Sequence, residues 1–168
     1  MTMEIYRGKR LSVERKIVTL PDGSTRERLV VHPGDAVAVL PIREDGCCYL
    51  VRQYRFSLDA SIFEVPAGTI EMGETPLETA RRELIEETGM QALTFIPRGY
   101  IHTTPGFTDE RIHLFEAHGF TPSDAYHRDE DEVIELVRFP LAEVEAMIAD
   151  GRINDAKTIC LVHRCTRR

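Results

Sequence analysis

The sequence lacks the patterns that define several specialised classes of protein. No apolar run approaches the roughly 20 residues that a membrane-spanning helix needs, and no signal peptide is recognisable. The cysteines show neither a CxxC pair nor the spacing of a disulfide framework; they are Cys47, Cys48, Cys160 and Cys165. We therefore expect a soluble, cytoplasmic protein with reduced thiols and no membrane partner.

Basic residues are also too few for a protein that binds nucleic acid through its charge. The chain has 21 Lys and Arg against 28 Asp and Glu, a formal net charge of -7, whereas nucleic-acid-binding domains present a basic patch. The acidic residues concentrate at Glu71–Glu87 and Asp129–Glu135. Such clusters can bind hard cations, although a solvated helix face and a polar loop are the ordinary alternative.

The alternation of apolar and polar residues predicts a β-rich chain with three helices. Ser12–Leu20 and Thr25–His32 are expected to form an N-terminal antiparallel hairpin around a Pro-Asp-Gly-Ser turn. Further strands are predicted at Asp35–Ile42, Cys47–Tyr54, Ser61–Val65, Leu93–His102, Ile112–Phe120 and Val133–Phe139, and helices at Thr75–Gly89, Leu141–Asp150 and Ala156–Arg164. No repeat or linker divides the chain, so residues 1–168 are expected to form one α/β domain, a mixed sheet covered by helices.

The clearest helix carries sequence signals at both ends. Thr75 is placed as its N-cap, Pro76 occupies the first helical position, and Glu78 completes a capping box. Gly89 supplies the left-handed residue that ends the helix. These signals predict a helix bounded by Thr75 and Gly89.

This helix separates an apolar stripe from a group of carboxylates. At about 100° per residue, Leu77, Ala80 and Leu84 share one face. Glu83 and Glu87 lie about 40° apart on a neighbouring face. The helix is therefore expected to bury one side and to present acids on another.

The acidic face needs compensation, because like charges at this spacing repel. Glu86 lies beside Glu83 and Glu87, and Arg82 is placed to pair with Glu78 and Glu86 but cannot neutralise three carboxylates. Mg²⁺ prefers oxygen ligands and keeps water positions for substrate phosphates. A metal site is the economical explanation, and a solvated Glu-rich face is the alternative.

The wider spacing around this helix resembles a known family signature. Gly68 is followed after five residues by Glu74 and after seven more by the run Arg-Glu-Leu-Ile-Glu-Glu-Thr-Gly-Met at 82–90. Residues 68–90 thus resemble the Nudix box at every specified position. The resemblance implies a loop–helix–loop unit in an α/β/α sandwich with a mixed β-sheet.

The resemblance also implies roles for individual residues of the box. Glu83, Glu86 and Glu87 would bind divalent metal, Mg²⁺ with Mn²⁺ as an alternative, and the carbonyl of Ala67 would join them. Arg82 would orient these acids. In this family the glycine at position 68 lets the backbone pass close to the metal site, in agreement with its steric freedom, whereas the glutamate at position 74 supports the loop.

Three flanking segments are similar to the ADP-ribose pyrophosphatase branch of that family. They are Val51–Arg55, Phe63–Gly68 and Thr104–Glu110. Arg55 offers a planar fork of donors for phosphate oxygens, and Arg52 is a second candidate that points to the opposite face of its strand.

The loop that contains Pro105 supplies the remaining substrate candidates. Gly106 and Phe107 would approach the sugar or the phosphates, and Glu110 would hydrogen-bond ribose hydroxyls. The alternative for Pro105-Gly106 is an ordinary turn.

The late acidic loop supplies candidates for the general base. Related enzymes bring a glutamate from this region over the substrate, which favours Glu130, with Glu132 as the second choice. A carboxylate acts as a base only where it reaches the attacking water. A solvated loop is the alternative, and Glu86 on the helix is a further candidate because some branches use a helix glutamate.

The resemblance implies Mg²⁺-dependent hydrolysis of ADP-ribose to AMP and ribose 5-phosphate. Another nucleoside diphosphate sugar such as GDP-mannose is the nearest alternative, and a non-catalytic nucleotide-sensing domain is a rival of another class. A nucleoside triphosphatase fits the flanking segments less well. Related enzymes also exchange N-terminal strands, so residues 1–35 are predicted to form a β arm that makes a homodimer, with Tyr6 a candidate to stack on adenine.

Overall fold

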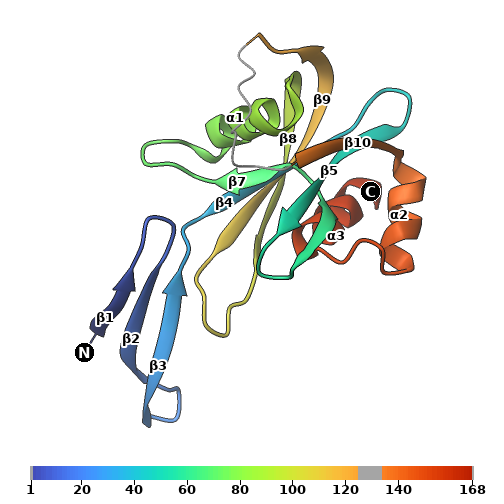
Figure 1. The fold of residues 1–168 in the computed structure, drawn as a ribbon. Helices are drawn as coiled ribbons and strands as arrows, with labels where there is room; N and C mark the ends of the chain where they lie inside the picture. Colours follow the sequence, from blue (N-terminus) through green and yellow to red (C-terminus); the bar gives the residue numbers. More distant parts are fainter. Residues whose placement is uncertain (1, 125–133, 168) are drawn as a thin grey trace.

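The computed structural model describes residues 2–124 and 134–167, and these form three sheets and three α-helices (Figure 1). The first sheet is antiparallel and has the order β1 (Thr2–Arg7), β2 (Ser12–Thr19), β3 (Thr25–His32). The predicted hairpin of β2 and β3 is confirmed, and the strand that was not predicted is β1, which pairs with the other edge of β2. None of the helices in the described ranges has the length and apolar character to cross a membrane.

The two sheets of the body differ in strand direction. The larger has the order β7 (Ala67–Thr69), β4 (Ala36–Pro41), β9 (Arg111–Pro122), β8 (Met90–His102). It is mixed, since β4 and β9 are parallel and the other pairs antiparallel. The smaller is antiparallel, with the order β10 (Ile134–Pro140), β5 (Cys47–Arg55), β6 (Ala60–Glu64).

The helices cover both faces of the mixed sheet. Successive residues of a strand point to opposite faces, so Val37 and Val39 pack with Ala80 and Leu84 of α1 (Pro76–Thr88). Ala38 and its neighbours pack in the other core, with residues of α2 (Leu141–Ala149) and α3 (Ala156–Thr166). Figure 1 shows α1 on one side of the sheet and α3 on the other. The predicted α/β/α sandwich is confirmed.

Two elements depart from the predicted boundaries. Strand β8 begins at Met90 instead of Leu93, since the left-handed Gly89 (φ 70°) turns the chain directly from α1 into the strand. The three residues of β7 were not predicted, because so short a strand shows no clear alternation. The remaining strands and helices of the described ranges lie close to their predicted positions.

The predicted apolar stripe of α1 is wrong at its first residue. Leu77 is 40% exposed, whereas Thr79, Ala80, Glu83 and Leu84 are buried. The hydroxyl of Thr79 donates to Glu74 at 2.8 Å, so the buried face also contacts the polar loop before the helix. The helix therefore buries a carboxylate that periodicity alone assigns to the neighbouring face.

Candidate active site

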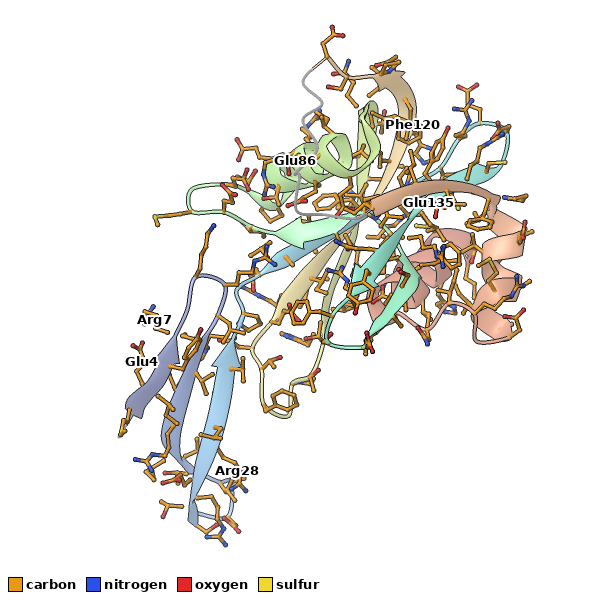
Figure 2. All side chains as sticks on the ribbon, in the orientation of Figure 1. Glu4, Arg7, Arg28, Glu86, Phe120 and Glu135 are labelled. Carbon is orange, nitrogen blue, oxygen red and sulfur yellow. The ribbon has the colours of Figure 1, made fainter. Side chains whose placement is uncertain are left out.

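One cavity of about 960 Å³ lies where α1, the mixed sheet, β5 and α3 approach one another. Its lining includes all three glutamates of the acidic helix face, Glu83, Glu86 and Glu87. Figure 2 labels Glu86 on α1. The helix that carries them is capped as predicted, because Thr75 and Glu78 exchange hydrogen bonds at 2.8 and 3.3 Å.

Gly68 allows the buried glutamate of this helix to pass close to the backbone of β7. A Cβ atom added at Gly68 would overlap the Glu83 carboxylate. Gly68 itself pairs with Val37 in the sheet, so it cannot easily move away. The expected close approach at this glycine is therefore present, and it brings a carboxylate against the main chain at the cavity wall.

Arg82 is the centre of the charge network beside the cavity. Its Nη1 donates to Glu83 at 2.7 Å and to Glu86 at 2.9 Å, and its Nε and Nη2 donate to both oxygens of Glu74 at 2.9 and 3.0 Å. Nη2 also donates to the carbonyl of Thr69 at 3.1 Å. The predicted role of orienting the helix acids agrees with this geometry.

One partner predicted for Arg82 is wrong. Glu78 accepts from the N-cap residue Thr75 instead, and Glu74, eight positions away from Arg82, takes the bidentate contact. The hydrogen bonds that Glu74 accepts, first those from Arg82 and then those from Thr79 and the N–H of Glu71, lower the pKa of Glu74 to about 2. Glu74 thus joins the loop to the helix as expected.

The helix carboxylates have the chemistry of a hard-cation site but are engaged with protein donors. Glu87 accepts from the backbone N–H of Ala67 at 3.2 Å, and Glu83 and Glu86 accept from Arg82. Within the described ranges, no three His, Cys, Asp or Glu residues converge as a metal cluster. The residues that could hold a metal are these three acids and the carbonyl of Ala67, because a carboxylate that accepts one hydrogen bond keeps further lone pairs for a cation.

Arg55 and Lys157, which also line the cavity, belong to a buried ion-pair network. Arg55 donates through Nε and Nη2 to the two oxygens of Glu64, both at 2.6 Å, and Lys157 also donates to Glu64. The Glu64 side chain is 2% exposed. Burial opposes its charged form, yet the hydrogen bonds and charges of Arg55 and Lys157 outweigh burial and lower the pKa of Glu64.

The N-terminus of α3 attaches this network to the core. Asp155 caps the helix through the N–H of Thr158 at 3.0 Å and accepts from Lys157 at 3.1 Å. The buried hydroxyl of Thr158 accepts from the N–H of Val65 at 2.9 Å. Arg55, predicted to bind substrate, is therefore held at the cavity by Glu64 of β6, which Lys157 of α3 also contacts.

Two residues of this network were missed as site residues. Glu64 and Lys157 lie 93 positions apart, and the resemblance at Phe63–Gly68 was noted only for that segment as a whole. A charged residue inside an otherwise apolar strand was the available signal for Glu64. Nothing local to Lys157 indicates a carboxylate partner so distant in sequence.

The remaining substrate candidates divide between the cavity and its surroundings. Glu110 lines the cavity and accepts from Thr103 at 2.5 Å. Arg52 is absent from the described lining and pairs with Glu135, labelled in Figure 2, at 3.6 Å, because it points to the other face of β5. The preference for Arg55 over Arg52 agrees with this placement.

The structure does not bring Gly106 and Phe107 to the cavity. Phe107 is 53% exposed, and its carbonyl accepts from the N–H of Val31 at 2.8 Å, which holds the loop against β3. The loop is placed away from the described cavity lining, and the predicted approach of both residues to the sugar or the phosphates stays a prediction. The physical reason for this placement is a tertiary hydrogen bond to the N-terminal sheet, which no local pattern reveals.

Of the candidates for the general base, Glu86 lines the cavity. Glu130 and Glu132 lie in residues 125–133, outside the described part of the chain. Their predicted role stays a prediction. The cavity does include three polar residues that the sequence analysis missed, namely Lys9, Arg10 and Gln53.

Comparison with known families and curated proteins gives consistent matches. A family profile described as the NUDIX domain matches residues 32–162. A methanol dehydrogenase activator from Bacillus methanolicus is 42% identical, over 96% of this chain and 88% of its own length. An ADP-ribose pyrophosphatase from Bacillus subtilis (strain 168) is 38% identical, over 92% of this chain and 84% of its own.

Two further similarities concern substrate and fold. A GDP-mannose pyrophosphatase from Yersinia enterocolitica is 37% identical, over 76% of this chain and 70% of its own length. A crystal structure of an ADP compounds hydrolase superposes with a TM-score of 0.86 at 24% identity, covering 98% of this chain and 89% of that one. The structural match shows that the two chains share a fold.

Proposed function

Since this chain belongs to the NUDIX domain family, we propose that it hydrolyses the pyrophosphate bond of ADP-ribose to AMP and ribose 5-phosphate. The observation that carries the proposal is the cavity itself, whose lining combines three carboxylates of α1 with Arg55 of β5. The carboxylates can bind a cation, and the arginine can donate to phosphate oxygens. Together these groups suit a diphosphate. The 38% identity to an ADP-ribose pyrophosphatase supports the choice of substrate.

The residues at the acidic wall fit a divalent cation, Mg²⁺ or Mn²⁺. Their donors are oxygens only, which hard cations prefer, and Gly68 leaves the space that Glu83 uses beside the backbone. Glu83, Glu86, Glu87 and the carbonyl of Ala67 would hold the ion. When bound, such an ion supplies charge neutralisation and a more acidic water.

The chain's own residues then bind and orient the substrate. Arg55, already oriented by Glu64, would donate to a phosphate oxygen. Glu110, on the cavity wall, would accept from ribose hydroxyls. Arg82 would hold Glu83 and Glu86 in place, and Glu130 or Glu132 would receive the proton of the attacking water.

Another nucleoside diphosphate sugar is the nearest alternative substrate. The 37% identity to a GDP-mannose pyrophosphatase favours GDP-mannose within that class. The two substrates share the diphosphate and differ in base and sugar. Arg55 and the acidic wall would serve both equally, so the substrate panel below decides between them.

A second candidate function is activation of a dehydrogenase. It is favoured by the 42% identity to a methanol dehydrogenase activator over nearly the whole chain. Addition of the purified protein to methanol dehydrogenase would then raise the dehydrogenase rate. Glu87→Gln tests whether that effect needs the cavity acids.

We further propose that the protein is a cytoplasmic homodimer that uses its N-terminal strands. Strand pairing places Met3, Arg15 and Leu29 in one row across the sheet, with Ile17 on the same face. Met3, Ile17 and Leu29 are each about half exposed. An uncovered apolar face of this kind is typical of an association surface.

The proposed activity is tested with ADP-ribose, GDP-mannose and a panel of nucleoside triphosphates, each with Mg²⁺ or with EDTA. We expect metal-dependent release of AMP from ADP-ribose and its loss in Glu87→Gln. Turnover confined to GDP-mannose or a triphosphate would keep the chemistry and replace the substrate. Binding without any turnover would point to the sensing role instead.

A further inference from the structure

The cationic residues of the cavity differ in how they are neutralised. Five basic side chains line it: Lys9, Arg10, Arg55, Arg82 and Lys157. Arg82 is paired with Glu74, Glu83 and Glu86. Arg55 and Lys157 both pair with Glu64. Within residues 2–124 and 134–167, neither Lys9 nor Arg10 has a hydrogen bond or ion pair. Among the described residues of the cavity, these two basic side chains are thus the ones that no carboxylate pairs.

Both of these cations come from the turn between β1 and β2. The N–H of Gly8 donates to the carbonyl of Leu11 at 2.9 Å, which leaves Lys9 and Arg10 alone at the tip. The Tyr6 ring packs over Gly8, where an added Cβ would overlap its hydroxyl group. The absence of a side chain at Gly8 therefore leaves room for the Tyr6 ring beside the backbone of the turn.

Tertiary contacts hold the sheet so that this tip meets the cavity. The N–H of Val31 donates to the Phe107 carbonyl at 2.8 Å, and His32 contacts Asp109 at 2.6 Å and Glu14 at 3.2 Å. These contacts join β2 and β3 to the loop between β8 and β9. In Figure 1 the β1–β2 turn is the end of the sheet nearest the loop between β7 and α1, whose Glu71 and Met72 also line the cavity.

We propose that Lys9 and Arg10 bind the diphosphate of the substrate at the rim of the cavity. This inference rests on the proposed function. A diphosphate brings negative charge into a cavity whose other cations are already paired, so two unpaired cations at its rim gain most from its arrival. Because both side chains are exposed, their attraction is also expected to weaken with salt.

The experiment that tests this proposal compares Lys9→Ala/Arg10→Ala with the control variant Arg26→Ala/Arg28→Ala in the full chain. Arg26 and Arg28 lie at the other end of the same sheet (Figure 2 labels Arg28), donate only to the backbone carbonyls of Thr25 and Glu27, and are absent from the cavity lining. Both double variants lose two positive charges. A difference between them therefore reports position and not net charge.

The readouts are kcat and KM for ADP-ribose and for GDP-mannose, and the Kd of each compound in EDTA. We expect KM and Kd to rise about tenfold in Lys9→Ala/Arg10→Ala, with kcat nearly unchanged and a weaker dependence on ionic strength. Lys9→Arg/Arg10→Lys should restore wild-type KM, since it keeps both charges. Arg26→Ala/Arg28→Ala should match the wild type.

Two results would overturn the inference, and they are distinguishable. If the wild type turns over either compound and both double variants share its KM and Kd, the turn does not bind the diphosphate and the proposed function stands. If the wild type neither binds nor hydrolyses either compound, the proposed function fails and this role fails with it.

Discussion

The body of the protein and the N-terminal sheet differ in how their charged side chains are buried and paired. In the body, Glu64 and Glu116 are nearly fully buried, and each is met by two basic side chains. In the sheet every residue of β1 is exposed, and pairs such as Arg7 with Glu4 lie at the surface. Buried pairs are costly to break, whereas exposed pairs contribute little. The body therefore holds the site geometry, and the sheet depends on contacts with other parts of the protein or with a partner.

The largest expected effect is on activity, at the helix acids. Glu83→Gln and Glu87→Gln should each lower kcat/KM at least about a hundredfold, because each removes a charged oxygen ligand from the acidic wall. Steady-state assays with Mg²⁺ measure this. Glu78→Gln is the control on the same helix, since it retains the capping acceptor, and comparable losses in all three variants would refute a specific role for the cavity acids.

Gly68→Ala should have the next largest effect. The added methyl group overlaps the Glu83 carboxylate, so that side chain must move, and a displacement of about 1 Å can cost about a hundredfold in rate. Overpacking should also lower the free energy of unfolding by about 1 to 3 kcal/mol. Steady-state assays measure the loss of rate, and urea denaturation measures the loss of stability.

Gly106→Ala is the control for Gly68→Ala. A Cβ at Gly106 meets nothing within 4 Å, so we expect near wild-type stability and activity. A strong loss of activity in Gly106→Ala would mean that its loop approaches the substrate after all.

Glu64→Gln tests the buried network of Arg55, Glu64 and Lys157. It leaves Arg55 and Lys157 facing a neutral group, and we expect the free energy of unfolding to fall by about 2 to 3 kcal/mol at pH 7, a figure reduced for the partial exposure of Arg55. Urea denaturation at several pH values measures it. Glu135→Gln, in an exposed pair with Arg52, should change stability by less than about 0.5 kcal/mol.

The pH dependence of the Glu64→Gln effect has a definite sign. The folded protein lowers the pKa of Glu64, so its stabilising contribution is present above the unfolded pKa of about 4.3. It is lost as the pH falls through the lower folded value. The difference between wild type and Glu64→Gln should therefore shrink below about pH 4, and a constant difference would contradict an ionised Glu64.

The smallest effect on the fold is expected in the N-terminal sheet. Ile17→Ser/Leu29→Ser should shift a dimer towards monomer in sedimentation equilibrium, while changing the monomer's stability by only about 0.5 kcal/mol. Lys16→Ser/Arg28→Ser, on the other face of the same strands, is the control. A wild type that is monomeric throughout would remove the proposed dimer.

Local sequence signals determined the position of α1, its acidic residues and the faces of β5. The capping box at Thr75, the stop at Gly89 and the Nudix box spacing predicted α1 and its three acids, because each signal acts within a few residues of itself. Side-chain alternation along β5 also separated Arg55 from Arg52 correctly. These features require only the backbone periods of helix and strand.

Only the tertiary structure decided how distant segments meet. It paired Lys157 with Glu64, gave Arg82 the partner Glu74, held Phe107 against β3, and brought Lys9 to the cavity rim. A polar contact between residues far apart in sequence depends on strand order and packing. Neither has a local period, and that is why no pattern within the sequence reveals such contacts.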